Sequence, residues 1–220
     1  TACSFVRDGM RIGLGTGSTV KYTVIEISRM ISEEGIDVIG VPTSEATREL
    51  AESLGIPLST LEEAAPLDIT IDGADEFDPN FQLIKGGGGA LTREKRVAEK
   101  SAAMVVVADD RKQVNTLGEF HLPLEVRKDD WYTVAAKLRE ICPGQVSIRG
   151  GESPYVTDNE GYILDCDFGP TISDPSSLEG HIKSIDGVVE VGLFVGMCDA
   201  VVMASNSGVT TLLKQGGRLD

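Results

Sequence analysis

Short apolar runs alternate with amphipathic stretches along the chain, and this alternation constrains the fold more than any other feature. Five segments carry it in the first third of the sequence: strand-like runs at 10–15, 36–42 and 67–73, and stretches of helical spacing at 20–35 and 44–55. Ser44 is suited to begin the second helix, and Gly35 and Gly55 are suited to end the two helices. The order predicts an α/β fold with a Rossmann-like parallel sheet, where ligands bind beyond the carboxyl ends of the strands.

The same domain continues with a helix at 91–101 and a valine-rich strand at 103–109. After about residue 128 the pattern changes to helix, hairpin, helix and strand, with a turn expected at 158–161. Residues 199–205 then return to the first sheet. The sequence therefore predicts a Rossmann-like catalytic domain at 1–127 plus 198–220, with a small α+β (ferredoxin-like) domain inserted at 128–197.

The formal charge of −15 narrows the choice of partners. Acidic residues are spread along the whole chain, so the surface field should repel nucleic acid and anionic lipid. The sequence contains no run of eighteen apolar residues, which is the pattern that would predict a membrane span. A small anionic substrate would need a local positive site, which directs attention to lysines among glycines.

The cysteines give no sign of a metal site or a disulfide framework. They are widely spaced at Cys3, Cys142, Cys166 and Cys198, without a C-x-x-C motif. The first ten residues lack a secretory signal, and we expect a cytoplasmic protein with buried thiols. A removed organellar transit peptide would leave no trace in this sequence.

Residues 13–19, GLGTGST, form a glycine-rich turn between the first strand and the first helix. Glycine allows close backbone approach, and the hydroxyls of Ser18 and Thr19 lie where helix amides favour an anion. The turn predicts a phosphate or sugar site; the alternative is a tight turn with Ser18 or Thr19 as the helix cap. The dinucleotide-binding motif G-x-G-x-x-G requires glycine where Ser18 stands if it is counted from Gly13, and where Val20 stands if it is counted from Gly15. A P-loop is also excluded, because no Gly-Lys-Ser/Thr sequence follows.

Residues 72–76, DGADE, directly follow an apolar strand, at the edge where such sheets bind ligands. Asp72 and Asp75 could share a proton and hydrogen-bond to sugar hydroxyls. Metal binding and a simple turn are the alternatives. His121 and His181 are the only histidines, and we expect surface or packing roles for both, so nothing supports a transition metal here.

Residues 85–95, KGGGGALTREK, form the third cluster. Ordering four consecutive glycines on folding costs much conformational entropy relative to the unfolded chain. Their presence therefore suggests that another group approaches their backbone closely. Lys85 supplies a positive charge at the edge of the run, and Thr92 is expected to cap the following helix. Glu94 would then lie in the first turn, where the alternative is an ordinary acidic residue favoured by the helix dipole.

Together, these three motifs, in this order and with these intervals, resemble the signature of the type A ribose-5-phosphate isomerase family. The likeness continues through VVVADDRKQV, LPLEV, VTDNEGYILD and GVVEVGLF, and so covers nearly the whole chain. The resemblance implies substrate contacts at one set of residues: Thr16, Gly17, Ser18, Thr19, Asp72, Gly73, Ala74, Asp75, Lys85, Gly86, Gly87, Gly88 and Lys112.

The resemblance also implies an activity, the interconversion of D-ribose 5-phosphate and D-ribulose 5-phosphate in the pentose phosphate pathway. Glu94 matches the family's catalytic base, and Asp72 and Asp75 match the groups that assist ring opening. Lys85 could stabilise the enediolate that forms. No metal and no cofactor are expected, and the resemblance implies a homodimer or homotetramer.

Two departures from the family pattern stand out. Gly89 occupies a position where the family usually has alanine, a small change that should not alter the chemistry. Family members also begin with a lysine-bearing helix, of which TACSFVRDG would be the end. One phosphate contact is therefore expected to lie outside this sequence.

Two other functions compete with the isomerase. A non-catalytic sugar-phosphate sensor would use the same phosphate site, but a transcriptional sensor would normally carry a basic DNA-binding segment, which is not visible beside a charge of −15. A nicotinamide oxidoreductase would need the dinucleotide fingerprint that residues 13–19 lack.

Overall fold

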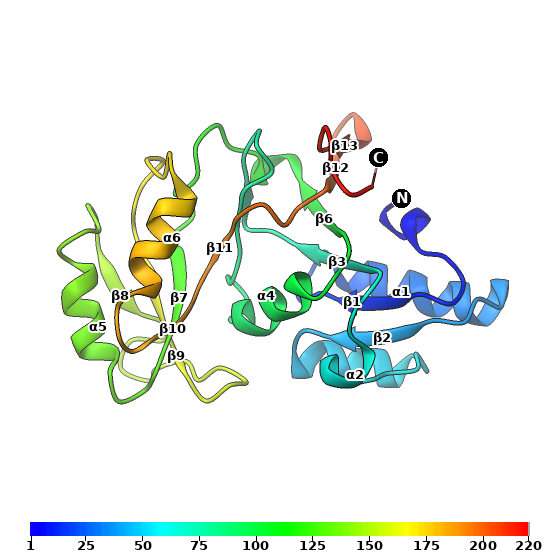
Figure 1. Cartoon of the computed structure of the whole chain (residues 1–220), viewed down its shortest axis with the longest axis horizontal. Coiled ribbons are helices and arrows are strands. Elements are labelled where there is room, and N and C mark those ends of the chain that lie inside the picture. The colour runs from blue at the N-terminus through cyan, green and yellow to red at the C-terminus, as the bar shows by residue number, and fades with distance from the viewer. Residues whose placement is uncertain (220) are drawn as a thin grey trace. The chain divides into compact units, whose positions relative to one another are not determined.

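The computed structural model describes residues 1–219 and forms two compact units, which share no sheet (Figure 1). The first unit contains Thr1–Gly73, Arg93–Asp110 and the chain from Met197 onward. The second contains Ala74–Thr92 and Arg111–Gly196. The chain passes between the units within helix α4 (Leu91–Glu99), so this helix has residues in both.

A six-stranded sheet forms the centre of the first unit, in the order β13-β12-β6-β3-β1-β2. Its strands are β1 (Arg11–Leu14), β2 (Ile39–Pro42), β3 (Ile69–Gly73), β6 (Met104–Asp109), β12 (Ala200–Ser205) and β13 (Gly208–Leu213). All neighbours are parallel except β12 and β13, which form an antiparallel hairpin. The prediction of a Rossmann-like parallel sheet is confirmed, whereas β13 was not predicted.

Helices of the first unit begin and end where local chemistry requires. They are η1 (Ala2–Phe5), α1 (Lys21–Arg29) with its π-helical continuation η2 (Met30–Glu34), α2 (Glu45–Ser53) and α3 (Leu61–Ala64). Ser44 accepts a hydrogen bond from the Thr47 amide at 3.1 Å, as expected of a helix cap. Gly35 ends the first helical segment with φ of 73°, which glycine adopts at no steric cost.

The second unit contains an antiparallel sheet in the order β10-β7-β9-β8. Its elements are β7 (Leu122–Val126), α5 (Trp131–Leu138), β8 (Val146–Ile148), β9 (Tyr162–Cys166), α6 (Pro175–Lys183) and β10 (Val188–Val191). Along the chain they follow the order β-α-β-β-α-β. A smaller sheet, β11-β5-β4, combines β4 (Glu76–Phe77), β5 (Leu83–Ile84) and β11 (Leu193–Phe194), and η3 (Asp110–Lys112) lies at the junction of the units in the sequence.

The division into units differs from the predicted boundary after residue 127. Segments 74–92 and 111–127 pack with the second unit, although the sequence pattern assigned them to the first domain. The reason is strand pairing, because β7 pairs with β9 and β10 rather than with the parallel sheet. An apolar strand does not show in its own sequence which sheet it will join.

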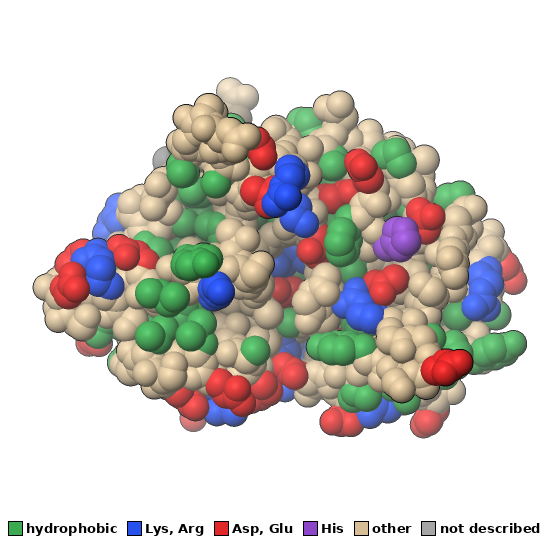
Figure 2. Space-filling model, turned by 180° about the vertical axis from the view of Figure 1, so that it is seen from behind, with side chains coloured by type: hydrophobic (Ala, Val, Ile, Leu, Met, Phe, Trp, Pro, Cys, Tyr) green, Lys and Arg blue, Asp and Glu red, His purple; other side chains and the backbone are tan. Residues whose placement is uncertain are grey.

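The surface shows no concentration of one charge on the face drawn in Figure 2, where acidic and basic side chains are interspersed. Tyr22 and Tyr132 are among the most exposed apolar side chains. Within residues 1–219, none of the helices has the length and apolar character needed to cross a membrane.

Candidate active site

The turn after β1 brings Gly15 and Thr16 against the end of β3. A Cβ atom on Gly15 would lie 2.2 Å from Oδ1 of Asp72, so only glycine allows this approach. The amide of Thr16 donates to the same oxygen at 3.1 Å. The Thr16 hydroxyl lies 2.7 Å from that of Thr43 and 2.8 Å from that of Ser44. Thr16 therefore fixes the turn through both its backbone and its side chain.

The rest of this turn leaves its hydroxyls at the surface. Gly17 has φ of 131°, and Ser18 and Thr19 are exposed. Helix α1 starts after Val20, which is its N-cap residue and makes no side-chain capping hydrogen bond. Neither Ser18 nor Thr19 therefore serves as the helix cap that was the alternative to a ligand site.

Asp72 and Asp75, predicted to act as a pair, have different surroundings. Asp72 is completely buried at the end of β3, and its Oδ1 also accepts the Gly73 amide at 2.7 Å. Asp75 lies in the second unit, is partly exposed, and accepts the Gly87 amide at 2.7 Å through Oδ2. The two carboxylates are thus each held by backbone amides of their own unit.

The glycine run starts from a buried lysine. Lys85 is only 2% exposed; its amide donates to the Gly192 carbonyl at 2.9 Å, and its ammonium lies 5.4 Å from the ring centroid of Phe194. Gly86 adopts φ of 112°, which favours glycine. A Cβ on Gly87 would lie 2.6 Å from Oδ1 of Asp75. Lys85 is therefore a buried residue, although it carries a positive charge.

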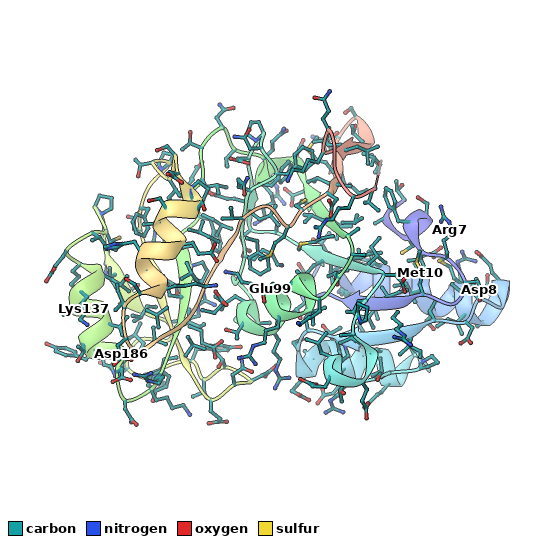
Figure 3. All side chains as sticks on the ribbon, in the orientation of Figure 1. Arg7, Asp8, Met10, Glu99, Lys137 and Asp186 are labelled. Atoms are coloured by element: carbon teal, nitrogen blue, oxygen red, sulfur yellow. The ribbon has the colours of Figure 1, made fainter. Side chains whose placement is uncertain are left out.

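Helix α4 carries Glu94 in its first turn, and this glutamate is only 4% exposed. An acidic residue placed there for the helix dipole alone would be expected at the surface, as Glu99 is at the other end of α4 (Figure 3). Burying a carboxylate costs free energy, so the helix dipole alone does not account for the position of Glu94.

Thr92 does not cap this helix, contrary to our prediction. Helix α4 already begins at Leu91, and the Thr92 hydroxyl donates to the buried carboxylate of Glu125. On the next residue, Arg93 donates to Glu45 at 2.7 Å within the first unit. That contact lowers the pKa of Glu45, with Arg48 adding to the effect.

Lys112 lies at the end of η3, with its ammonium 5.7 Å from the ring centroid of Phe120. The two residues line a cavity of about 380 Å³ in the second unit, together with Asp75 and Glu76. Glu76 accepts the amides of Gly118 and Phe120 and so shapes one wall. Burial raises the pKa of Glu76, although these two amides act in the opposite direction.

Known proteins of similar sequence identify the family of this chain. Residues 39–208 match the family described as Ribose 5-phosphate isomerase A (phosphoriboisomerase A). The chain belongs to this family. It is 46% identical over 214 residues to the ribose-5-phosphate isomerase A of Parvibaculum lavamentivorans, covering 94% of this chain and 92% of that protein. It is 48% identical over 218 residues to the enzyme of that name from Cereibacter sphaeroides, covering 96% and 87%.

Solved structures of ribose 5-phosphate isomerases have the same fold. The structure of the type A enzyme of Methanocaldococcus jannaschii matches with a TM-score of 0.90 at 42% identity, covering 97% of this chain and 95% of that one. A D-ribose-5-phosphate isomerase solved in complex with phospho-erythronic acid matches with a TM-score of 0.92 at 37% identity, covering 96% and 94%. Our family prediction is confirmed, as is the fold class.

Two side chains near the isomerase motifs were not singled out in the sequence. Arg149 donates to the carbonyls of Gly86 and Gly87, at 2.9 and 3.1 Å. Glu125, 1% exposed, accepts hydrogen bonds from Thr92 and from two residues of the 157–161 turn. The only available signal was a charged residue within an apolar strand, for Glu125, or directly after one, for Arg149, and both are too common to be distinctive.

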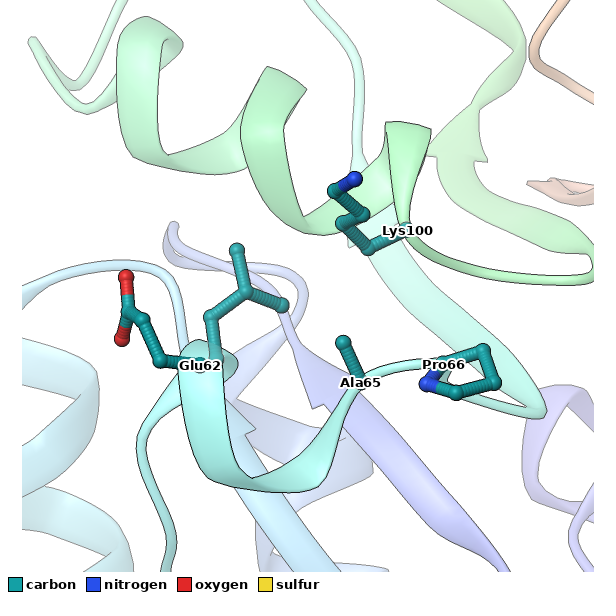
Figure 4. A pocket seen from close by; sticks show the side chains of 5 residues that line it. Glu62, Ala65, Pro66 and Lys100 are labelled. Carbon is teal, nitrogen blue, oxygen red and sulfur yellow. The ribbon is translucent and has the colours of Figure 1, made fainter.

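The described part of the chain also has features outside the predicted site residues, among them four cysteines and a further cavity. Within residues 1–219, no group of three or more histidine, cysteine or acidic side chains is arranged to hold a metal ion. The four cysteines are buried and reduced, as expected, and burial raises the pKa of Cys3 to about 11 and that of Cys198 to about 12. A cavity of about 530 Å³ is lined by residues that include Glu62, Ala65, Pro66 and Lys100 (Figure 4), and none of the predicted site residues is among them.

Proposed function

We propose that this chain interconverts D-ribose 5-phosphate and D-ribulose 5-phosphate, a reaction of the pentose phosphate pathway, with Glu94 as the general base. The burial of Glu94 in the first turn of α4, in a chain of this family, is the observation that carries the proposal. A relative was solved in complex with phospho-erythronic acid, which, like the proposed substrate, carries a phosphate and several hydroxyls on a short carbon chain.

The proposed reaction starts with opening of the sugar ring, assisted by hydrogen bonds between the sugar and the carboxyl groups of Asp72 and Asp75. Glu94 then removes the proton on carbon 2 of the aldose and returns it to carbon 1, while the hydroxyl proton on oxygen 2 ends on oxygen 1. The intermediate is an enediolate. Its negative charge grows during the reaction, so a buried cation such as Lys85 would stabilise the transition state more than the ground state.

The remaining predicted contacts take binding roles. Ser18 and Thr19 present hydroxyls at the start of α1, where backbone amides favour an anionic group such as phosphate. Lys112 supplies a second positive charge in the second unit, and we assign it to substrate binding. Each chemical step is assigned to a carboxylate or a lysine, so we expect turnover to persist after treatment with a chelator.

A coupled assay for ribulose 5-phosphate formation tests the proposal, with Glu94→Gln compared with Glu99→Gln on the same helix. Glutamine keeps the shape of the side chain but cannot accept the proton, so turnover should fall at least about 100-fold with near-normal substrate binding. The exposed Glu99 is the matched control and should have no effect. A folded Glu94→Gln variant that keeps more than about a tenth of wild-type turnover would exclude Glu94 as the base.

A further inference from the structure

A guanidinium group contacts the glycine run from one side, in addition to the backbone hydrogen bond from the Gly89 amide to the Gly86 carbonyl. Nη1 of Arg149 donates to the Gly86 carbonyl at 2.9 Å and to the Gly87 carbonyl at 3.1 Å. The other edge of the guanidinium contacts both carboxylate oxygens of Asp165, with Nε 2.9 Å from Oδ2. Both side chains are only 20% exposed, so water competes weakly for these hydrogen bonds.

The sheet of the second unit keeps this ion pair in place. Asp165 lies on β9, opposite Ser147 of β8, and Arg149 directly follows β8. The Arg149 amide also donates to the Ile163 carbonyl of β9, at 2.9 Å. The guanidinium is therefore carried by two paired strands, while the glycines that it contacts belong to a turn.

The positions of the two carbonyls determine the direction of the neighbouring amides. A trans peptide is planar, so its N–H points away from its C=O. The Gly86 carbonyl faces Arg149, and the Gly87 amide of the same peptide accordingly points to Asp75 at 2.7 Å. By the same geometry, the Gly88 amide points away from Arg149, because the Gly87 carbonyl faces it.

We propose that Arg149 is a positioning residue of the isomerase, which holds and polarises the glycine run so that the Gly88 amide is directed at the negative charge of the substrate. This inference rests on the proposed function, which assigns substrate contacts to Lys85, Gly86, Gly87 and Gly88. A cation at the carbonyl draws electron density from the peptide and makes its N–H a stronger donor. A preorganised amide of this kind contributes most where negative charge develops during the reaction.

A lysine could not replace this arginine. The guanidinium contacts two carbonyls and a carboxylate at once through its planar fork, whereas an ammonium on a flexible stem cannot reproduce that geometry. Arg149, Asp165 and Gly87 also line a cavity of about 450 Å³, so a small solute can reach the position of the guanidinium.

The test compares Arg149→Ala and Arg149→Lys with Arg127→Ala, a change at another arginine of the second unit, whose ion-pair partners are Asp130 and Asp186. We expect kcat/KM of both Arg149 variants to fall at least about 30-fold, mainly in kcat, because the lost interaction acts on developing charge. Free guanidinium ion at millimolar concentration should restore part of the activity of Arg149→Ala and none of that of Arg149→Lys. Arg127→Ala should behave as wild type.

Hydrogen exchange at Gly87 and Gly88 gives a readout that does not depend on catalysis. Loss of the Arg149 contacts should speed exchange of the Gly87 amide at least about tenfold, because the turn that presents it to Asp75 loosens. An inactive wild-type enzyme with a protected Gly87 amide would refute the proposed function and leave the arginine contacts standing. Wild-type kcat and unchanged exchange in folded Arg149→Lys would overturn the positioning role, as would an Arg149→Ala variant that guanidinium fails to rescue.

Discussion

The two units hold their candidate site residues by different means. In the first unit, Gly15 and Asp72 are held by the register of β1 and β3, with Asp72 accepting two backbone amides. In the second unit, the glycine run has no strand of its own, and side chains hold it in place: Asp75 on one side and Arg149 on the other. Strand pairing supports the first arrangement, whereas the second combines side-chain hydrogen bonds with the backbone hydrogen bond from the Gly89 amide to the Gly86 carbonyl, at 2.9 Å.

This difference predicts how each region responds to mutation. A side-chain change in the second unit can shift the loop as well as remove a group, since the loop depends on side-chain contacts. The first unit should tolerate loss of a polar side chain at its surface but not an added atom between β1 and β3, because its strands are closely packed. The following variants test this contrast.

Lys85→Ala should have the largest effect of these variants. Under the proposed function, loss of this buried cation should reduce kcat roughly 100-fold or more, because groups that act on a transition state have effects of this size. Lys112→Ala, which removes a partly exposed cation, should raise KM and leave kcat near normal. Steady-state kinetics of both variants provide the measurement. Equal effects of the two variants on kcat would mean that the difference in burial between Lys85 and Lys112 does not correspond to a difference in role.

Gly15→Ala tests the close contact of the first unit. The added Cβ would lie 2.5 Å from the Cα of Asp72, which is backbone and cannot move aside cheaply. Overpacking of this kind should cost about 1–3 kcal/mol of unfolding free energy, and displacement of Asp72 should lower turnover by roughly tenfold. Denaturant unfolding and the isomerase assay measure the two effects.

Gly180→Ala in helix α6 is the matched control, since nothing lies within 4 Å of the added atom. Alanine should stabilise that helix by about 0.5–1 kcal/mol. A Gly15→Ala variant as stable and active as Gly180→Ala would show that the contact between β1 and β3 relaxes easily.

Glu125→Gln tests the anchor of helix α4 in the second unit. Glutamine accepts fewer hydrogen bonds than the carboxylate that now binds Thr92, Thr157 and Asn159, so stability should fall by about 1–2 kcal/mol. Turnover should fall a few-fold, because Thr92 lies two residues before Glu94. Glu160→Gln, at an ion pair whose acidic side chain is 81% exposed, should be silent in both assays.

Glu45→Gln should have the smallest effect. Its carboxylate pairs with Arg93 and Arg48 at the surface of the first unit, and such exposed pairs contribute about 0–1 kcal/mol. The Arg93 contact lowers the pKa of Glu45, so the stabilisation should be present above the ordinary carboxyl pKa of 4.5 and disappear as the pH falls below it. Thermal unfolding of wild type and Glu45→Gln should therefore converge at low pH. A difference in melting temperature that persists at low pH would contradict an electrostatic origin of the stabilisation.

Much of the first unit followed from the sequence alone. The alternation of apolar runs and helical stretches predicted β1, β2, β3 and β6, because burial of periodic apolar faces leaves few other arrangements. Ser44 and Gly35 marked helix ends through local hydrogen bonding and backbone freedom, which depend on few neighbours. The motifs around Gly15, Asp72 and Lys85 also sufficed to predict the isomerase family.

The tertiary structure alone decided which strand joined which sheet and which side chains support the site. Strand β7 pairs within the second unit, and Thr92 bonds to Glu125 instead of capping α4. Arg149 reaches the glycine run from more than sixty positions away in the sequence. Local propensity describes how a segment folds on itself; partners distant in sequence are chosen by the packing and hydrogen bonding of the whole chain, and a single sequence does not display them.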